Sequence, residues 1–298
     1  MRLSTQTKRI FGAYGIDKGI EILANAGYDA MDFSFFSEYY YSTELTKEYF
    51  SEIRKKSEAL GLSYNQAHAP YASSCADEEA TKSRFEEITR AMRNASYLGV
   101  ENIVVHPCQH MAYRDEGVPE KLFEINMDFY NRLKPYCEEY GIKVAIENMW
   151  QSVGQKILPS TCARPEEFIR YVDELNSGCF VACLDIGHSM LVCENPADFI
   201  RKLGNKRLKA LHVHDVDGIH DSHTLPYSGI IDWESVAKAL AEIDYKGDFT
   251  FEADNFMSGK PEELYPQYAK TMVETGRYII KKINDYKKYG GHSNGKLS

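Results

Sequence analysis

The most constraining feature of this sequence is an alternation, repeated about eight times, between short apolar runs and longer amphipathic runs. The short runs are almost continuously apolar, as in Val144-Ala145-Ile146, which is typical of parallel strands covered on both faces. The longer runs carry apolar residues three and four positions apart, as amphipathic helices do. The predicted strands are 2–7, 28–34, 62–68, 101–106, 142–147, 179–185, 207–214 and 248–253.

This alternation predicts the fold class. Eight strand–helix units in a chain of 298 residues fit an α/β protein with one (β/α)8 TIM barrel, spanning residues 1–288, and a flexible C-terminal tail at 289–298. A doubly wound open sheet is the alternative. It would usually carry a glycine-rich fingerprint after its first strand, and neither GxGxxG nor GxxxxGK[ST] occurs in the sequence.

Composition excludes several classes of protein. The 35 Lys and Arg residues against 44 Asp and Glu give a net charge of -9, which argues against nucleic acid as a partner. No stretch approaches the roughly 18 apolar residues that a membrane helix needs. The seven cysteines form no CxxC pair and no secretory signal is visible, so we expect free thiols and a cytoplasmic protein.

Ionisable side chains stand where the apolar runs end. In a barrel, all of these strand ends open onto the C-terminal face, where the loops build the active site. Each residue alone could be an ordinary hydrogen-bonding group at a loop entry, but the recurrence on six consecutive strands favours a functional site. The residues are His68, His106, Glu147, Asp185, His188, His212, His214 and Glu252, with Asp221 and His223 from the loop after the seventh strand.

Carboxylates and imidazoles that converge in this way suit a divalent metal. Mixed oxygen and nitrogen ligands favour Mn2+ or Co2+, are also compatible with Zn2+ or Mg2+, and include no thiolate. His212 and His214 lie two residues apart on one strand and therefore share a face. Because His214 is nearer the C-terminal end, we expect it to bind the metal, with His212 behind it.

Seven strings along the chain resemble those of the xylose isomerase-like TIM barrels, a superfamily of sugar isomerases, epimerases and the endonuclease IV group. They are His68-Ala69-Pro70-Tyr71, His106-Pro107, Ile146-Glu147-Asn148, Leu184-Asp185-Ile186-Gly187-His188, His212-Val213-His214-Asp215, Asp221-Ser222-His223 and Phe251-Glu252. Resemblance to the ketose 3-epimerase branch implies one metal held by Glu147, Asp185, His214 and Glu252. It also implies that the two glutamates are the acid/base pair and that His188 contacts substrate. The arginine that those epimerases carry shortly after the strand-seven histidine is missing from 215–221.

Resemblance to the endonuclease IV branch implies a different site, with three zinc ions and nine ligands. Residues of all nine types occur here in order: His68, His106, Glu147, Asp185, His188, His214, Asp221, His223 and Glu252. Two strings depart from that branch. Its Asp-Arg-His reads Asp221-Ser222-His223 in this chain, and Tyr227-Ser228-Gly229 stands where Gly-Glu-Gly is expected.

The sequence therefore predicts a divalent-metal-dependent isomerase or epimerase of a sugar, polyol or inosose, working through a metal-stabilised enediolate. Glu147 and Glu252 are the expected catalytic residues. The expected substrate contacts are His68, His106, His188, His212, Asp221, His223 and Trp150. The alternatives are a trinuclear-zinc phosphodiesterase and a metal-free barrel that acts as a binding protein. The expected partner is a small carbohydrate, and the sequence leaves a homo-oligomer open.

Overall fold

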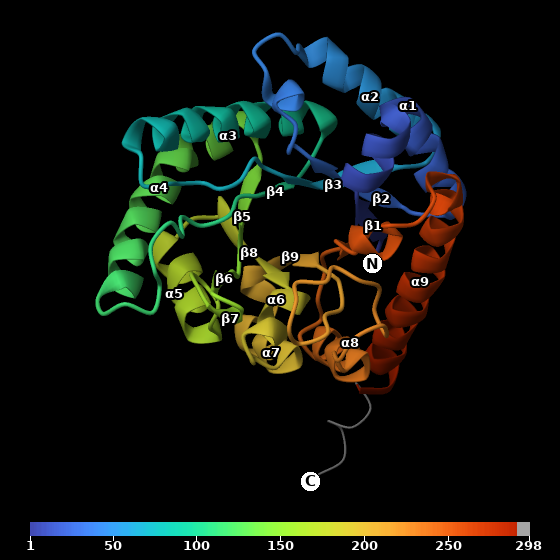
Figure 1. Cartoon of the computed structure of the whole chain (residues 1–298). Coiled ribbons are helices and arrows are strands. Elements are labelled where there is room, and N and C mark those ends of the chain that lie inside the picture. Colours follow the sequence, from blue (N-terminus) through green and yellow to red (C-terminus); the bar gives the residue numbers. More distant parts are fainter. Residues whose placement is uncertain (291–298) are drawn as a thin grey trace.

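The computed structural model describes residues 1–290 and consists of a ring of parallel strands surrounded by helices (Figure 1). The strands follow one another around the ring in the order β10-β1-β2-β3-β4-β5-β8-β9. The ring closes between β9 and β10, where Val213 N donates to Thr250 O (2.9 Å) and Glu252 N donates to Val213 O (3.1 Å). The strands are β1 (Leu3–Gln6), β2 (Ala30–Ser34), β3 (Ser63–His68), β4 (Asn102–Val104), β5 (Lys143–Glu147), β8 (Phe180–Asp185), β9 (Leu208–His212) and β10 (Phe249–Phe251).

Helices follow the strands and cover the outside of the ring (Figure 1). They are α1 (Lys8–Ala26), α2 (Lys47–Ala59), α3 (Glu78–Leu98), α4 (Val118–Tyr140), α5 (Pro165–Leu175), α6 (Ile186–Leu191), α7 (Pro196–Arg207), α8 (Trp233–Glu242) and α9 (Tyr265–Gly290), with 3-10 turns η1 (Glu38–Tyr41), η2 (Asp254–Met257) and η3 (Glu262–Leu264). The predicted TIM barrel is confirmed, and each predicted strand range contains one observed strand.

The boundary predicted at residue 288 falls inside α9, so the division into barrel and tail remains a prediction. Residues 291–298 of the expected tail lie outside the described residues. All seven cysteines are free, as expected. Within residues 1–290, the helices are too short or too polar to cross a bilayer.

The two faces of the strands bury different side chains. The large core packs the outer face of the strands against the helices, and a separate small cluster of buried side chains contains Val104, Ala145, Val181, Cys183 and Ala210. Because side chains alternate along a strand, the small cluster faces the barrel interior. The same alternation decides which residues face inward at the C-terminal end of each strand.

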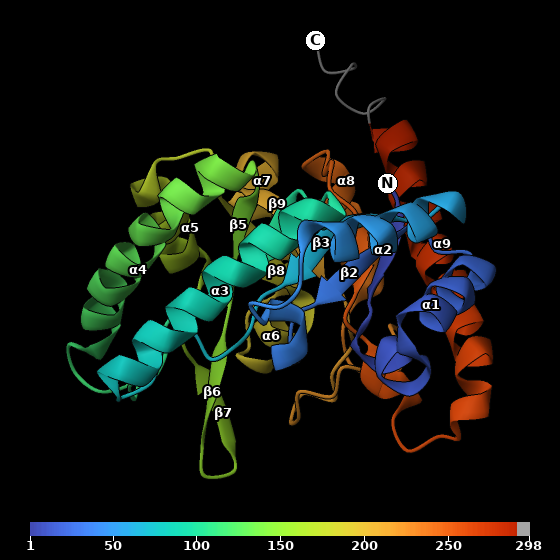
Figure 2. The same cartoon turned by 90° about the horizontal axis from the view of Figure 1, so that it is seen from above.

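The sequence analysis missed a two-stranded antiparallel sheet in the loop after β5. Its strands are β6 (Trp150–Val153) and β7 (Lys156–Pro159), and Figure 2 shows this hairpin extending beyond the barrel. Gly154, at φ 63°, supplies the left-handed residue of the turn between the two strands. The sequence signal for this hairpin is a glycine between two short segments. Such a signal is weak within a chain that divides into longer strand–helix units.

A half-buried carboxyl group lies at the start of α5, directly after this hairpin. Tyr113 Oη donates to Glu167 Oε2 (2.8 Å), and Tyr113 N donates to Gln151 Oε1 on the hairpin (3.4 Å). Burial raises the pKa of Glu167 to about 7, although the Tyr113 hydroxyl opposes that rise. Glu167 therefore gains its charge near neutral pH in the folded protein.

We expect this group to make stability depend on pH. The pKa of Glu167 is about 7 in the folded chain against an ordinary 4.5, so the folded chain binds more protons between these values. Stability must then fall as the pH rises through that window. Glu167→Gln should reduce this pH-dependent loss of unfolding free energy by about 1–3 kcal/mol. The measurement is urea unfolding at about pH 5 and about pH 8. The exposed Glu174→Gln is the matched control, and an equal pH dependence in all three proteins would contradict the assignment.

Candidate metal centre

The inward-facing positions at the C-terminal ends of β5, β8 and β9 are ionisable. Glu147, Asp185 and His212 each come two residues after a side chain of the small interior cluster, so each points into the barrel. Glu252, which follows β10, lies beside them because its backbone pairs with β9. The barrel thus brings residues that are 105 positions apart, from 147 to 252, into one place.

His212 lies at the centre of the first group. Its Nδ1 atom is 3.1 Å from Glu147 Oε1, 3.0 Å from Glu252 Oε2 and 4.0 Å from Asp185 Oδ2. Each of the four residues can offer one ligand atom so that all four atoms lie within 4.8 Å of one another. The four side chains are nearly or fully buried. We call this set the central group.

A second group shares Glu147 with the first. His106 Nε2 lies 3.0 Å from Glu147 Oε2 and 2.8 Å from His68 Nε2. Glu147 Oε2 is nevertheless without a hydrogen bond from any described residue. A carboxylate and two imidazoles in close contact without a hydrogen bond to that oxygen are well placed to share a cation.

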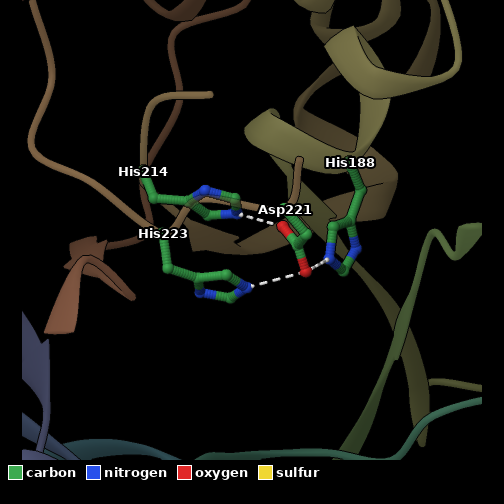
Figure 3. A group of neighbouring side chains, drawn as sticks. All are labelled: His188, His214, Asp221 and His223. Carbon is green, nitrogen blue, oxygen red and sulfur yellow. Dashed lines mark hydrogen bonds and ion pairs between the residues drawn. The ribbon is translucent and has the colours of Figure 1, made fainter. Parts of the chain in front are cut away.

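A third group lies on the other side of Asp185 and consists of His188, His214, Asp221 and His223 (Figure 3). Asp221 Oδ2 is 3.0 Å from His223 Nε2 and 3.4 Å from His188 Nε2. Asp221 Oδ1 is 3.9 Å from His214 Nε2. His214 joins this group to the central group, because its Nε2 is also 3.0 Å from both carboxyl oxygens of Asp185.

Hydrogen bonds to the backbone hold these side chains in place. The side-chain amide of Asn148 donates to Asp185 O (2.9 Å) and its oxygen accepts from Asp185 N (2.7 Å), which ties the ends of β5 and β8 together. Asp185 also caps α6 by accepting from His188 N (2.6 Å). His188 thereby acquires a fixed position one turn above Asp185.

The loop that carries Asp221 and His223 is organised by the buried carboxylate of Asp215. That carboxylate accepts from the indole of Trp233 (2.8 Å) and from the backbone N–H groups of three loop residues, Val216, Tyr227 and Ile231. Asp215 also pairs with Thr224 through two backbone hydrogen bonds. A long irregular loop is rigid when a single carboxylate accepts so many of its donors.

Ionisation in the site is decided by contacts among its members. Burial alone would raise the pKa of Glu147, but His212 and His106 outweigh burial and hold that pKa well below its ordinary value. Burial likewise opposes the charge on Glu252, and His212 reverses this so that the pKa is lowered. Burial lowers the pKa of His68 to about 3, so this imidazole is neutral and has a free lone pair at neutral pH.

Seven members of the groups line a cavity of about 550 Å³ at the mouth of the barrel: His68, His106, Glu147, His188, Asp221, His223 and Glu252. Apolar surface comes from Phe36, Tyr71, Met149 and Trp150. The Trp150 indole donates to Asp221 Oδ2 (3.3 Å), which connects the base of the hairpin to the third group. A polar floor below an aromatic wall is the usual character of a small-molecule site.

All predicted site residues lie at this mouth, but they divide among the groups differently from the expectation. His212, which we expected behind the metal, lies with Glu147, Asp185 and Glu252. His214, the expected ligand, contacts only Asp185 of that set and otherwise belongs to the third group. The assignment of His214 as the metal's imidazole therefore remains a prediction, and His212 is a second candidate.

Sequence reasoning missed three residues that support the site. Gln6 Nε2 donates to Glu252 Oε1 (2.7 Å), Asn148 braces Asp185, and Asp32 faces His212 from below. Gln6 ends β1 but is not ionisable, and Asp32 lies two residues before the end of β2, so neither residue fits the pattern of ionisable strand ends. Asn148 is uncharged, and its position next to Glu147 gives no sequence signal for its contact with Asp185.

The model of the family described as "Xylose isomerase-like TIM barrel" matches residues 20–274. The chain belongs to this family. An uncharacterised protein from Methanocaldococcus jannaschii is 28% identical over 271 residues, covering 89% of this chain and 88% of that protein. A mannonate dehydratase from Brachyspira hyodysenteriae is 25% identical over 245 residues, covering 78% of this chain and 64% of the dehydratase.

Two solved structures share the fold of this chain. A D-tagatose 3-epimerase-like protein superposes with a TM-score of 0.76 at 22% identity, covering 96% of this chain and 99% of that one. The IOLI protein, which was solved with a binding zinc atom, superposes with a TM-score of 0.73 at 19% identity, covering 96% and 99%. At these sequence identities, the structural similarity shows the shared barrel fold and does not assign an activity.

We expect Gly187→Ala to displace His214, which joins the third group to the central group. A Cβ atom at Gly187 would lie 2.0 Å from Cε1 of His214 and 2.6 Å from both ring nitrogens, so the imidazole must leave Asp185. Zn2+ affinity, measured by calorimetric titration, should fall by about 10-fold or more. Gly178→Ala is the matched control, because nothing lies within 4 Å of its Cβ. Unchanged Zn2+ binding by Gly187→Ala would show that His214 binds no metal.

Proposed function

We propose that this protein is a divalent-metal-dependent isomerase or epimerase of a carbohydrate, which transfers a proton between carbon and the pair Glu147 and Glu252. The observation that carries the proposal is the central group, in which two buried glutamates approach one imidazole nitrogen from different strands. The match to D-psicose 3-epimerase from Enterocloster bolteae supports the same class of reaction. That protein is 31% identical over 115 residues, which cover 39% of this chain and 35% of the epimerase.

The donor set fits a divalent cation. Burying several carboxylates together is strongly unfavourable unless positive charge compensates them. The histidines supply part of that charge here, yet Glu147 Oε2 and Asp221 Oδ1 are left without hydrogen bonds from described residues. Glu147, Asp185, Glu252 and one imidazole, from His212 or His214, would hold the ion, with Mn2+ or Co2+ favoured by the mixed oxygen and nitrogen donors. When bound, the cation would supply Lewis acidity that polarises a substrate carbonyl.

The chain's own residues would then move the proton. A carboxylate on one side of the substrate takes a proton from the carbon beside the carbonyl, and the second carboxylate returns one, which is worth about 10²–10⁴-fold in rate. Glu147 and Glu252 are ionised at neutral pH because of His212, so either can act as the base. His68, His106 and His188, together with Asp221 and His223, line the same cavity and are the proposed hydrogen-bonding partners of substrate hydroxyls.

The cavity favours a carbohydrate as substrate. Its volume of about 550 Å³ admits a sugar, and the Trp150 indole at its wall can pack on the apolar face of a pyranose or furanose ring. The net charge of -9 gives no general attraction for a polyanion. A small neutral polyol therefore suits the site better than a nucleic acid strand.

We expect Glu147→Gln and Glu252→Gln each to abolish turnover, since the amide cannot accept or return the proton. The measurement is exchange of substrate C–H for solvent deuterium by NMR, across a panel of ketoses, aldoses and inososes, with a loss of about 10²-fold or more. The exposed Glu138→Gln is a control that should retain activity. Exchange at the wild-type rate in either variant, with metal still bound, would remove that glutamate from the mechanism.

A second candidate, a trinuclear-zinc phosphodiesterase, is favoured by one specific observation. The three groups adjoin one another, since Glu147 belongs to two of them and Asp185 contacts His214 of the third. Burial opposes charge on His223, but Asp221 raises its pKa to about 10, so the ring holds a proton that a cation would have to displace. Loading of the third group by metal therefore competes with protonation.

Metal content distinguishes the two candidates. For the isomerase we expect about one tightly held Mn2+ or Co2+ per chain by elemental analysis, loss of activity with a chelator, and rescue by the same metals. About three zinc ions per chain, with cleavage of a phosphodiester, would replace this proposal by the second candidate. A protein that binds no metal and is indifferent to chelators would contradict both.

A further inference from the structure

A buried carboxylate that none of the proposed roles uses lies beneath the central group. Asp32, near the end of β2, is fully buried. Gln66 Nε2 donates to its Oδ2 (2.8 Å), but Oδ1 has no hydrogen-bond partner among the described residues. An unsatisfied buried carboxylate oxygen is costly, so its retention calls for a partner that binds when the site is loaded.

The nearest candidate partner is the unused nitrogen of His212. Nε2 of this fully buried ring also has no hydrogen-bond partner among the described residues, and it lies 3.7 Å from Asp32 Oδ2. The opposite nitrogen, Nδ1, faces Glu147 and Glu252. The His68 ring stacks on His212 at 4.9 Å and 16°, which limits rotation of the imidazole. The ring is thus held with one nitrogen toward the mouth and the other toward Asp32.

Metal binding would determine the tautomer of this ring. An imidazole that gives the Nδ1 lone pair to a cation, while remaining neutral, must carry its proton on Nε2. That N–H would point at Asp32, and a closing movement of roughly 1 Å would bring the pair to hydrogen-bond distance. The buried Nε2–H of His212 would then have the Asp32 carboxylate as its acceptor, through Oδ2, which can accept a second hydrogen bond beside that from Gln66.

We propose that Asp32 is a positioning residue that accepts the Nε2 proton of His212, and so selects His212 rather than His214 as the imidazole of the central metal. This inference rests on the proposed metal-dependent function. A carboxylate behind a ligating histidine fixes the ring and makes its free nitrogen more basic, which tightens metal binding. Among the described residues, Asp32 forms its imidazole ion pair with His212, whereas His214 pairs with Asp185 and Asp221, so Asp32 is placed for this role behind His212 and not behind His214.

The first test is Co2+ binding by Asp32→Asn, which keeps the shape of the side chain and removes its charge. We expect the affinity for Co2+ to fall about 10- to 100-fold and the visible absorption of bound Co2+ to shift, because the ligand field of His212 changes. Asp29→Asn is the matched control on the same stretch of chain. Asp29 accepts hydrogen bonds from Leu3 N (2.7 Å) and Arg277 Nη1 (2.7 Å), and both contacts lie away from the site. The control should lose stability but keep the wild-type Co2+ affinity and spectrum.

The second test uses only the wild-type protein, so it remains valid if Asp32→Asn does not fold. Side-chain ¹⁵N NMR of the wild-type protein loaded with Zn2+ should show His212 protonated on Nε2 and bound to metal through Nδ1. Metal bound through Nε2 of His212, or through His214 alone, would overturn the inference. So would an Asp32→Asn protein with wild-type Co2+ affinity and spectrum.

These outcomes separate this inference from the proposed function. A wild-type protein that binds no Co2+ contradicts the metal-dependent function itself. A wild-type protein that binds Co2+ and exchanges substrate protons, with Asp32→Asn unchanged in affinity, contradicts only the role of Asp32.

Discussion

The structure depends on the cost of placing several carboxylates in one buried volume. Parallel strands in a closed ring bring their carboxyl ends to a single rim, and four of the acids at this rim are nearly or fully buried: Asp32, Glu147, Asp185 and Glu252. Such a cluster persists only where imidazoles, N–H donors or a cation compensate the charge. In this sequence, polar side chains occupy the strand ends, and a small apolar layer lies next to them in the barrel interior.

Much of the remaining architecture supports that arrangement. Asn148 and the capping carboxylate of Asp185 connect neighbouring strand ends, and Asp215 organises the loop that carries Asp221 and His223. Asn148 and Asp215 have no proposed contact with metal or substrate. They replace the water that would otherwise solvate the loop backbone, so the ionisable side chains keep fixed separations.

The barrel and the convergence of polar strand ends were predictable from the sequence because both follow from local patterns. Apolar runs identify the strands, and a polar residue such as Glu147 at the end of a run is visible without any tertiary information. The partition into groups was not predictable, since His212 and His214 share a strand face and differ only in depth along the barrel axis. The β6–β7 hairpin and the role of Asp32 were missed for a related reason: both depend on contacts between distant segments, through Gln151 and Tyr113 in one case and through His212 in the other.

The seam between β9 and β10 has a consequence for biosynthesis. Glu252 reaches the rim because its backbone pairs with Val213, and it directly follows β10, the last of the eight barrel strands along the chain. A nascent chain that lacks β10 would present Glu147, Asp185 and the histidines on an unclosed sheet, without Glu252. The complete central group therefore exists only after ring closure, so its four buried side chains come together only when the whole barrel has folded.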